Sequence, residues 1–373
     1  MKVKVGITGQ GGFLGYHLFH HLKNLNDEFE LVEFNSVYFE DSGKLDEFVI
    51  KCDVIVHLAA VNRHKNEEDL YRINCALTRT LVESLLRTKS RPHVLMSSST
   101  QEDENNLYGE SKRSSRRLLS EWANSCGANF SGLLIPNVFG PFSRPFYNSV
   151  IATFSYQLLN GQHPIIVLDR KLDLIYVGDL VDEFVLLIRS SDNSHTLPIR
   201  ARITQKVSEI LADLSSFNEL YIVRGEIPDL HSRYKVQLFN TFRSYIDIKS
   251  FYPRRLQSNK DSRGEFVEVI RHGMSGQTSY SVTFQGITRG NHFHTRKIER
   301  FAVVKGTARI ELRKVGTDEV FYFNLDGSNP SYIDMPVWYI HNIKNIGSED
   351  LITTFWTNEL FDPKDTDTYF QIV

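Results

Sequence analysis

Hydrophobic residues in the first part of the chain form short unbroken runs that alternate with helix-like segments. Residues 2–8 (KVKVGIT) have the composition of a buried strand, and a helical segment from Tyr16 to about Leu25 follows the turn GQGGFLG. Further strand-like runs recur at the spacing of βαβ units, at residues 29–34, 53–60 and 93–99. This pattern predicts an α/β domain built on a doubly wound, Rossmann-type parallel sheet.

The pattern changes at residues 241–260, a basic and turn-rich stretch that contains no long apolar helix. Beyond it, apolar residues alternate along short strands with no helices between them, which favours an antiparallel sandwich or barrel. These segments are FVEVI, TSYSVTF, RFAVVKGTARIEL, EVFYFNL, YIDMPVW and DLITTFW. We therefore expect an α/β domain over residues 1–247 and an all-β domain over residues 248–373.

Composition and charge narrow the possible classes of protein. A length of 373 residues suits two domains, and 41% hydrophobic residues are enough to form cores. The formal net charge of −2 gives no electrostatic reason to expect nucleic acid or an anionic membrane as a partner. No apolar run reaches the ~18 residues of a membrane span, and the chain enters a strand at once, without room for a signal peptide. The three cysteines have neither disulfide nor metal-site spacing, so we expect a soluble, cytoplasmic protein.

A glycine repeat lies at the first strand-to-helix turn. Gly9 permits the tight turn, Gly12 lets the backbone approach a pyrophosphate, and Gly15 allows close contact between helix and strand. Such a repeat is a weak signal alone, but the βαβ strands that follow it favour a dinucleotide site. Glu33, near the end of the second strand, is a candidate for the acid that binds the ribose of NAD, and no arginine typical of NADP enzymes stands nearby. The choice between NAD and NADP stays open at this point.

The segment YGESK places Tyr108 and Lys112 on one face of a helix. A neighbouring ammonium group is expected to lower the pKa of a phenol from its usual ~10, so that the phenol can exchange a proton with a carbonyl oxygen. The same spacing occurs on solvated helices. Here it follows a strand that ends in the serine run 97–99, within a βαβ domain, and a catalytic pair is the favoured interpretation.

Residues 1–245 resemble the extended short-chain dehydrogenase/reductase family, through TGQGGFLG, HLAA, SSS, YGESK, PNVFGP and LDLIYVGDL. The resemblance implies that Tyr108 transfers the proton, that Lys112 also holds the nicotinamide ribose, and that Ser99 binds the substrate oxygen. The implied cofactor-binding residues are Gly9, Gly12, Phe13, Leu14, Gly15, Leu58, Ala59, Ala60, Tyr108 and Lys112. Asn137 and Asn148 are the implied substrate-binding residues of this domain. Because the loop before Tyr108 is short, Ser98, Ser99 and Thr100 all stay candidates for the assisting hydroxyl.

A second group of chemically active residues lies in the all-β part. Residues two apart on a strand project to the same side, so His292 and His294 are expected to point into the barrel together. Glu299 stands at the head of the next strand, and His341 comes from a distant one. Three imidazoles and a carboxylate form a suitable ligand set for Zn²⁺, Fe²⁺ or Mn²⁺.

This segment resembles the first motif of the cupin family, G-x5-H-x-H-x4-E-x6-G. The matching positions are Gly286, His292, His294, Glu299 and Gly306. In a looser second motif Pro336, His341 and Asn345 match, whereas Pro330 and Trp338 stand where glycines are expected. The resemblance implies a jelly-roll barrel with a metal held by His292, His294, Glu299 and His341.

DSRGEFVEV (261–269) and GITRGNH (286–292) also resemble segments of nucleotide-sugar 3,5-epimerases, which share the cupin barrel. In that family the histidine matching His292 is the base, and the arginines matching Arg263 and Arg289 bind the sugar nucleotide. A metal-bound imidazole has no free lone pair with which to remove a proton, so the complete ligand set favours the ligand role for His292. The other candidate bases are Lys297, Tyr280, Tyr332 and Tyr339.

A reductase domain followed by a metal-binding cupin resembles a family of bifunctional capsule- and lipopolysaccharide-biosynthesis enzymes over nearly the whole chain. The segments NLYGESK, KGTARIEL and FDPKDTDTYF are among those that carry this likeness. It implies C3 epimerisation of a UDP-2-acetamido-2,6-dideoxy-4-keto-hexose in the cupin, then reduction of the C4 ketone to the L-talose sugar. It also implies NADPH, one Zn²⁺, a UDP-sugar substrate and a homodimer.

Three other interpretations stay open. In the first, the protein is a reductase whose cupin only binds sugar or mediates dimerisation. A nicotinamide-sensing regulator is the second, and the intact pair Tyr108 and Lys112 counts against it. The third is a metal oxygenase, which the ligand set allows.

Overall fold

The computed structural model divides the chain into two compact units, each described here by itself. Unit 1 comprises Met1–Thr153 and Val167–Val207, and unit 2 comprises Phe154–Ile166 and Ser208–Val373. The boundary expected near residue 248 lies within unit 2, whose helices precede it in sequence, and as a domain boundary it stays a prediction. The structure describes residues 2–190, 193–256, 258–261, 264–267, 269–270 and 276–373.

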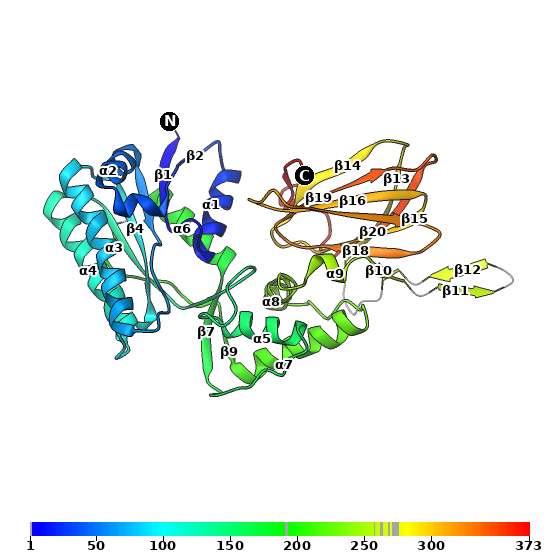
Figure 1. Ribbon diagram of the computed structural model, residues 1–373, viewed down its shortest axis with the longest axis horizontal. Helices are drawn as coiled ribbons and strands as arrows, with labels where there is room; N and C mark the ends of the chain where they lie inside the picture. The colour runs from blue at the N-terminus through cyan, green and yellow to red at the C-terminus, as the bar shows by residue number, and fades with distance from the viewer. Residues whose placement is uncertain (1, 191–192, 257, 262–263, 268, 271–275) are drawn as a thin grey trace. The chain divides into compact units, whose positions relative to one another are not determined.

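Unit 1 is built on a parallel sheet of six strands in the order β2-β1-β3-β4-β5-β8 (Figure 1). Its strands are β1 (Val3–Thr8), β2 (Phe29–Val32), β3 (Val54–His57), β4 (His93–Ser99), β5 (Phe130–Ile135) and β8 (Leu197–Pro198). The run expected at residues 93–99 coincides with β4, whereas β2 and β3 are shorter than the runs that predicted them. A smaller sheet contains β6 (Asn137–Phe139), β7 (Lys171–Tyr176) and β9 (Ile203–Lys206).

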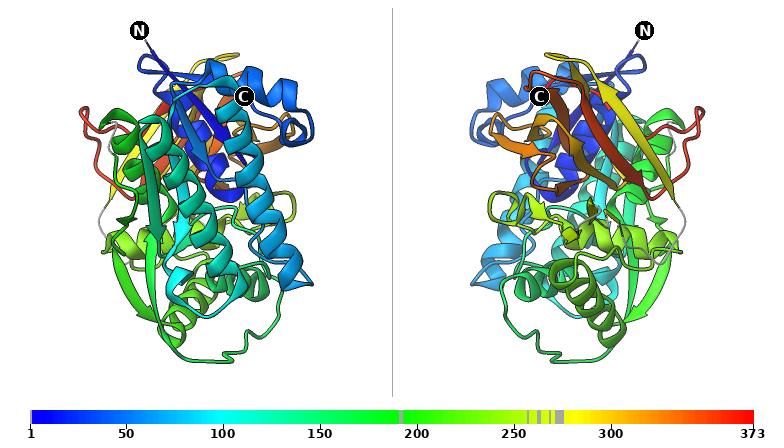
Figure 2. Two further views of the ribbon diagram at one scale, coloured as in Figure 1. Left: turned by 90° about the vertical axis from the view of Figure 1, so that its left-hand side faces the viewer. Right: turned by 90° about the vertical axis from the view of Figure 1, so that its right-hand side faces the viewer.

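Helices cover both faces of the six-stranded sheet, because successive side chains of a buried strand point to opposite faces. Val54 and Val56 pack in a core with α1 and α6, whereas Ile55 packs in a second core with α2, α3 and α4. These helices are α1 (Phe13–Asn24), α2 (Ser42–Lys51), α3 (Glu67–Thr88), α4 (Leu107–Cys126) and α6 (Val177–Ser190). The left view of Figure 2 shows α3 and α4 in front of the sheet. The expected doubly wound Rossmann-type fold is confirmed.

Unit 2 contains two five-stranded antiparallel sheets, in the orders β10-β18-β15-β20-β13 and β17-β16-β19-β14-β21. The first consists of β10 (Arg254–Arg255), β18 (Ser331–Met335), β15 (Glu299–Lys305), β20 (Leu351–Thr357) and β13 (Gln277–Thr283). The second consists of β17 (Val320–Asp326), β16 (Thr307–Lys314), β19 (Tyr339–Asn345), β14 (Thr288–Phe293) and β21 (Tyr369–Phe370). Helical segments precede them: part of α5 (Val150–Leu159), then α7 (Val207–Phe217), η3 (Asn218–Val223), α8 (Arg233–Arg243) and α9 (Ile248–Phe251). The expected all-β cupin-like fold of the later part is confirmed.

The sheets of unit 2 enclose an apolar core to which both contribute. Leu312 and Ile343 come from one sheet, and Val303 and Ile333 come from the other. The pairing of β14 with β19 sets His292 opposite His341, so two distant histidines become cross-strand neighbours. None of the helices in the described ranges has the length and apolar content that a membrane crossing requires.

Candidate active sites

The glycine turn between β1 and α1 has the geometry that its residues predict. Gly9 adopts φ 76°, and a Cβ atom there would lie 2.8 Å from the backbone nitrogen of Ala59. A Cβ on Gly15 would lie 2.2 Å from the carbonyl oxygen of Gly9. Gly12 is the N-cap of α1, and its N–H donates to the Gly9 carbonyl at 2.9 Å. These contacts leave a side-chain-free turn at a helix N-terminus, which fits a pyrophosphate.

The other expected cofactor-binding residues lie at the same edge of the sheet. Phe13 and Leu14 begin α1, and residues 58–60 directly follow β3. The carboxyl ends of parallel strands are where dinucleotides bind in such sheets. Glu33 is exposed and is the first residue after β2, so it occupies the position at which NAD enzymes carry an acid. The expectation of NADPH therefore rests on the family resemblance and not on this geometry.

Tyr108 and Lys112 lie on α4 and share a face, as expected. The Lys112 Nζ atom lies 5.8 Å from the centre of the Tyr108 ring and donates to the carbonyl oxygen of Ser97 at 3.1 Å. Burial raises the pKa of Tyr108 to about 12, and the nearby Tyr147 adds to the shift. Burial also lowers the pKa of Lys112 to about 8, and the charge of Glu102 opposes that shift. The expected lowering of the Tyr108 pKa is therefore wrong, because the loss of hydration on burial raises this pKa.

The structure separates the three candidates for the assisting hydroxyl. Ser98 donates its proton to the buried carboxylate of Glu102, which also pairs with Arg116 at 2.7 Å. Thr100 is exposed. Ser99 accepts a hydrogen bond from the Gln101 N–H at 3.1 Å, and within the described residues its own O–H has no acceptor. The Ser98 proton is thus engaged, and the choice of Ser99 as the assisting hydroxyl stays a prediction.

A tight contact explains the short loop before Tyr108. Ser99 caps the short helix η2 (Thr100–Asp103), which carries the chain from β4 toward α4. A Cβ atom on Gly109 would lie 2.0 Å from the carbonyl oxygen of Gln101, so the helix and the loop make backbone contact there. Only glycine fits this contact, which allows the loop to be short.

Tyr147 is a further residue of this site that the sequence did not single out. It contributes to the raised pKa of Tyr108, so the two phenols are close neighbours. Its hydroxyl accepts a hydrogen bond from the Asn62 N–H at 3.0 Å, and the Arg144 guanidinium lies 5.3 Å from its ring centre. Its only sequence signal was its place in the segment YNSVIATF, which carried a family likeness but no motif.

The two expected substrate-binding asparagines of unit 1 are exposed. Asn137 begins β6 and donates from Nδ2 to the carbonyl oxygen of Asp173 at 3.3 Å. Asn148 directly follows Tyr147, so it belongs to the loop that approaches Tyr108. Their roles in substrate binding stay predictions. Arg263, the expected sugar-nucleotide contact of the later part, lies outside the described residues.

The four expected metal ligands of unit 2 converge. One ligand atom from each of His292, His294, Glu299 and His341 lies within 4.8 Å of all the others. The Glu299 Oε2 atom is 3.0 Å from His294 Nε2, 3.2 Å from His341 Nε2 and 3.9 Å from His292 Nε2.

Backbone carbonyls fix the orientation of two of these histidines. His294 Nδ1 lies 2.6 Å from the carbonyl oxygen of Asp367, and His341 Nδ1 lies 3.2 Å from that of Tyr339. A carbonyl oxygen only accepts, so each Nδ1 carries the proton and each Nε2 presents a lone pair to the cluster. Both Nε2 atoms and Glu299 Oε2 are buried without a well-directed hydrogen bond within the described part of the chain. Such converging, unsatisfied acceptors fit a divalent cation such as Zn²⁺.

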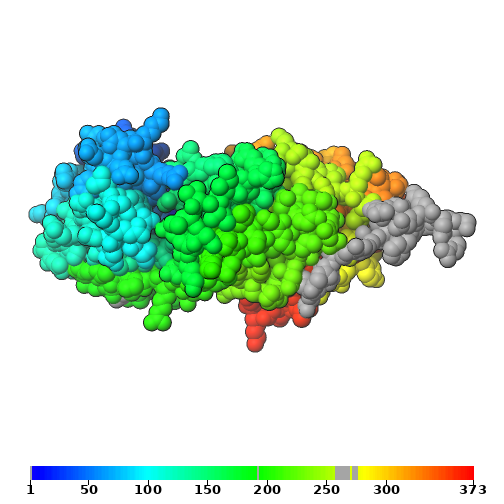
Figure 3. Space-filling model, turned by 90° about the horizontal axis from the view of Figure 1, so that it is seen from below, coloured from blue at the N-terminus to red at the C-terminus, as the bar shows by residue number. Residues whose placement is uncertain are grey.

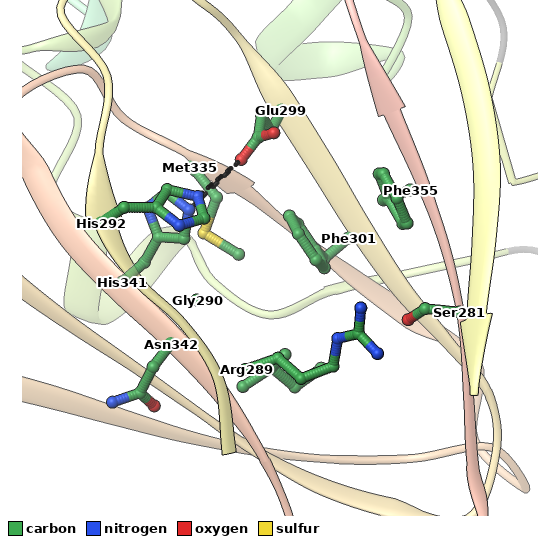
Figure 4. Close-up of a pocket in the computed structure, with 11 residues that line it drawn as sticks. Ser281, Arg289, Gly290, His292, Glu299, Phe301, Met335, His341, Asn342 and Phe355 are labelled. Carbon is green, nitrogen blue, oxygen red and sulfur yellow. Dashed lines mark ion pairs between the residues drawn. The ribbon is translucent and has the colours of Figure 1, made fainter. Parts of the chain in front are cut away.

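A cavity of ≈ 220 Å³ opens beside this cluster (Figure 4). It is lined by Ser281, Arg289, Gly290, His292, Glu299, Phe301, Met335, His341, Asn342, Ile343 and Phe355. Figure 4 shows the Arg289 side chain extended toward Ser281. Within the described residues, none of the other candidate bases lines this cavity. Lys297, for example, donates from Nζ to the carbonyl oxygen of Thr366 at 2.7 Å.

Trp338 replaces a motif glycine but keeps its backbone conformation. Its φ of 63° lies in the left-handed region that favours glycine. Its N–H donates to the carbonyl oxygen of His294 at 2.7 Å, and its ring stacks on Phe293 with centres 5.6 Å apart. These contacts hold the turn between β18 and β19, so the substitution leaves the position of His341 intact.

Both parts of the chain match known protein families. The model of the NAD dependent epimerase/dehydratase family matches residues 5–199, and that of the polysaccharide biosynthesis C-terminal domain matches residues 259–369. The UDP-2-acetamido-2,6-beta-L-arabino-hexul-4-ose reductase of Pseudomonas aeruginosa strain PA103 is 31% identical over 373 residues, which cover 98% of each chain.

Solved structures give the same result. The capsular polysaccharide assembling protein CapF from Staphylococcus aureus is 34% identical, with a TM-score of 0.62 and all of both chains covered. RMD from Pseudomonas aeruginosa, solved with NADPH, is 19% identical with a TM-score of 0.53, over 58% of this chain and 83% of its own, and shares the fold alone. The chain therefore belongs to the NAD-dependent epimerase/dehydratase family and is a CapF-like protein, in which that domain precedes a polysaccharide biosynthesis C-terminal domain.

Proposed function

We propose that this protein processes a UDP-linked 4-keto sugar in two steps, C3 epimerisation in the barrel of unit 2 and then NADPH-dependent reduction in unit 1. The proposed substrate is a UDP-2-acetamido-2,6-dideoxy-4-keto-hexose, and the product is UDP-2-acetamido-2,6-dideoxy-L-talose for capsule or lipopolysaccharide biosynthesis. The observation that carries the proposal is the likeness along 98% of both chains to a reductase of such a 4-keto sugar. The expected homodimer is part of this proposal.

The reduction needs a hydride at C4 and a proton on the oxygen of the same carbonyl group. The hydride comes from the reduced nicotinamide, and Tyr108 supplies the proton. Because the pKa of Tyr108 is raised to about 12, the phenol keeps its proton at neutral pH and can donate it. The Ser99 O–H would bind the substrate oxygen, and Lys112, whose Nζ atom lies 5.8 Å from the Tyr108 ring centre, would hold the nicotinamide ribose.

The epimerisation uses the acidity that the C4 ketone confers on the C3 hydrogen. A base removes this proton, the charge moves to the ketone oxygen, and a proton returns to the opposite face of C3. A divalent cation held by His292, His294, Glu299 and His341 would stabilise negative charge on that oxygen when bound. Arg289 lines the cavity and offers a guanidinium group to the diphosphate. Once C4 is an alcohol, C3 is no longer acidic, so epimerisation must precede reduction.

A single-activity reductase with a non-catalytic, sugar-binding or dimerising barrel is the second candidate function. The absence of Lys297 and the three candidate tyrosines from the cavity lining, within the described residues, favours it. The first candidate has a base available if His294, Glu299 and His341 alone hold the cation, because the His292 side chain is 24% exposed and is the histidine farthest from Glu299. Both candidates share the reductase step.

The two candidates differ in one measurable exchange reaction. The full-length Tyr108→Phe variant, loaded with Zn²⁺ and lacking NADPH, is incubated with the UDP-4-keto sugar in D₂O. Deuterium at C3, detected by mass spectrometry and NMR, is expected from this variant and from one that also carries Glu319→Gln on the exposed face of the barrel. Adding Glu299→Gln should abolish the exchange. If the folded, metal-loaded Tyr108→Phe variant incorporates no deuterium, the epimerase step is refuted and the single-activity reductase remains.

A further inference from the structure

The segment from Asp362 to Val373, called here the C-terminal strap, folds back onto the strand that carries His292. Its short strand β21 pairs with β14 and sets Phe370 opposite His292. Beyond it, the Gln371 N–H donates to the carbonyl oxygen of Asn291 at 2.9 Å. Asn291 adopts φ 60° at the irregularity between Gly290 and His292, so the strap contacts the point at which β14 bends. In Figure 3 part of the red C-terminal region stands at the molecular surface.

Asp367 is a buried residue of this strap, and its side chain holds the turn between β14 and β15. Its Oδ1 atom accepts from the Thr295 N–H at 3.1 Å and from the Thr295 hydroxyl at 2.6 Å. Its Oδ2 atom accepts from the N–H groups of Arg296 and Lys297, both at 2.9 Å. One carboxylate therefore makes four hydrogen bonds to the turn that joins His294 to Glu299, and Asp367 is 5% exposed.

The backbone of the same residue contacts a metal ligand directly. The Asp367 carbonyl oxygen lies 2.6 Å from His294 Nδ1 and selects the tautomer whose Nε2 lone pair faces the cluster. Asp367 has φ 43°, a left-handed conformation that aims its carbonyl and its carboxylate at neighbouring targets. The residue thus acts on His294 through two independent contacts.

We propose that Asp367 is a positioning residue of the metal centre, and that the C-terminal strap sets the affinity of that centre for its cation. The inference depends on the proposed metal centre and extends it. Partners that orient ligating histidines in this way change metal affinity by about 10–100-fold when they are removed. The expected consequence is a protein whose metal affinity depends on a segment about 70 residues away in sequence from the ligands it orients.

The test is the full-length Asp367→Asn variant. Asparagine tolerates the left-handed backbone, but its NH₂ group faces N–H donors and loses their hydrogen bonds, so the Asp367 carbonyl is no longer fixed against His294 Nδ1. The Zn²⁺ dissociation constant, measured by competition with a chromophoric chelator, should rise about 10–100-fold. Asp365→Asn, on the same strap, is the matched control. The Asp365 side chain is 64% exposed and pairs with Arg296 of the turn, and the dissociation constant should stay within about twofold of wild type.

A second measurement separates positioning from a general loss of structure. In the metal-free wild type and in Asp365→Asn, histidine NMR should show His294 as the Nδ1–H tautomer, and Asp367→Asn should show a mixture. Thr295→Val, which removes one hydrogen bond from the same carboxylate, should give an intermediate Zn²⁺ dissociation constant. An unchanged dissociation constant with an unchanged tautomer in Asp367→Asn would overturn the inference. If the wild-type chain itself binds no Zn²⁺, the proposed metal centre fails instead, so the two failures are distinguishable.

Discussion

A buried ion pair on the face of the barrel that adjoins the helices of unit 2 gives a sharp stability prediction. Arg300 and Asp334 stand opposite each other on β15 and β18, and their side chains are 1% and 0% exposed. Arg300 donates to Asp334 from Nε at 2.7 Å and from Nη2 at 3.0 Å. The Tyr221 hydroxyl, from the helical part of unit 2, donates to the same carboxylate at 2.6 Å. Asp334→Asn keeps the shape of the side chain but removes its charge.

We expect Asp334→Asn to lower the free energy of unfolding strongly, because Arg300 keeps its charge. Removing one partner of a buried ion pair typically costs 3–5 kcal/mol, since the other charge is left buried without compensation. A domain is stable by only about 5–15 kcal/mol in total, so we expect Asp334→Asn to remove about a fifth or more of the stability of unit 2. Tyr221→Phe removes one hydrogen bond to a charged group and should cost about 1.5–3 kcal/mol.

The tryptophans allow the unfolding of unit 2 to be followed by itself. Trp338 and Trp356 belong to unit 2 and are 5% and 0% exposed, whereas Trp122 is buried in unit 1. Urea unfolding in a Trp122→Phe background, followed by fluorescence, therefore reports on unit 2. The control is Glu319→Gln, whose partner Lys249 lies 3.2 Å away on the surface, and it should cost less than about 1 kcal/mol.

Two results would refute this reasoning. One is a decrease in the free energy of unfolding of less than about 1 kcal/mol for Asp334→Asn, since that would mean that the Arg300 charge is hydrated or paired elsewhere. The other is a failure of the double variant Arg300→Met/Asp334→Leu to recover most of the lost stability. Apolar side chains of similar volume often replace a buried pair without cost, so the double variant should be more stable than Asp334→Asn alone.

Three further outcomes are expected. Tyr108→Phe should lower the rate of NADPH oxidation by about 10²–10⁴-fold in a spectrophotometric assay, because the proton donor is lost; a smaller loss would place the donor elsewhere. His57, buried between Thr8 and Thr78, has its pKa lowered to about 3 by burial and by the charge of Lys112. Below pH ~6.5 the unfolded chain takes up a proton that the folded chain does not. The free energy of unfolding of unit 1 should therefore fall by up to about 1.4 kcal/mol per pH unit, down to pH ~3. In His57→Gln this pH dependence of the unfolding free energy should vanish from urea titrations followed at Trp122, and an unchanged pH dependence would contradict the prediction. Chelation of the metal should destabilise unit 2 by about 2.7 kcal/mol relative to protein with Zn²⁺ at 100 times its dissociation constant, whereas His294→Ala should not respond to the chelator.

The fold could be predicted from sequence where a local pattern determines it. After His93, the residues of β4 are all apolar or small, and the expected run coincides with the strand. β21 was not expected as a strand, because its partner β14 lies far away in sequence. The TRGNHF segment of β14 was absent from the apolar strand runs because it is largely polar, and only the spacing of His292 and His294 indicated a strand there.

Site residues likewise could be predicted where a fixed sequence spacing brings them together, and were missed where a long-range contact does. The four metal ligands could be predicted because a strand period and a short turn determine how close His292, His294 and Glu299 come. The predicted shift of the Tyr108 pKa had the wrong direction, because the burial of this side chain depends on loops from elsewhere in the chain, such as the one that carries Tyr147. Asp367 was missed because its carbonyl and its carboxylate act on His294 and on a turn about 70 residues away, and such a long-range contact leaves no local sequence pattern.

The buried pair also connects the helical part of unit 2 to the chemistry of the barrel. Successive residues of a strand face opposite sides, so Glu299 and Met335 line the cavity while their neighbours Arg300 and Asp334 face away from it. Tyr221 binds that pair, and residues before 248 therefore hold the strands that carry a metal ligand. A fragment of residues 248–373 lacks this contact, and we expect it to bind Zn²⁺ weakly, whereas a fragment that begins at residue 208 should retain the affinity of the full chain. Equal affinity in the two fragments would show that the barrel positions Glu299 without help from the helices that precede it.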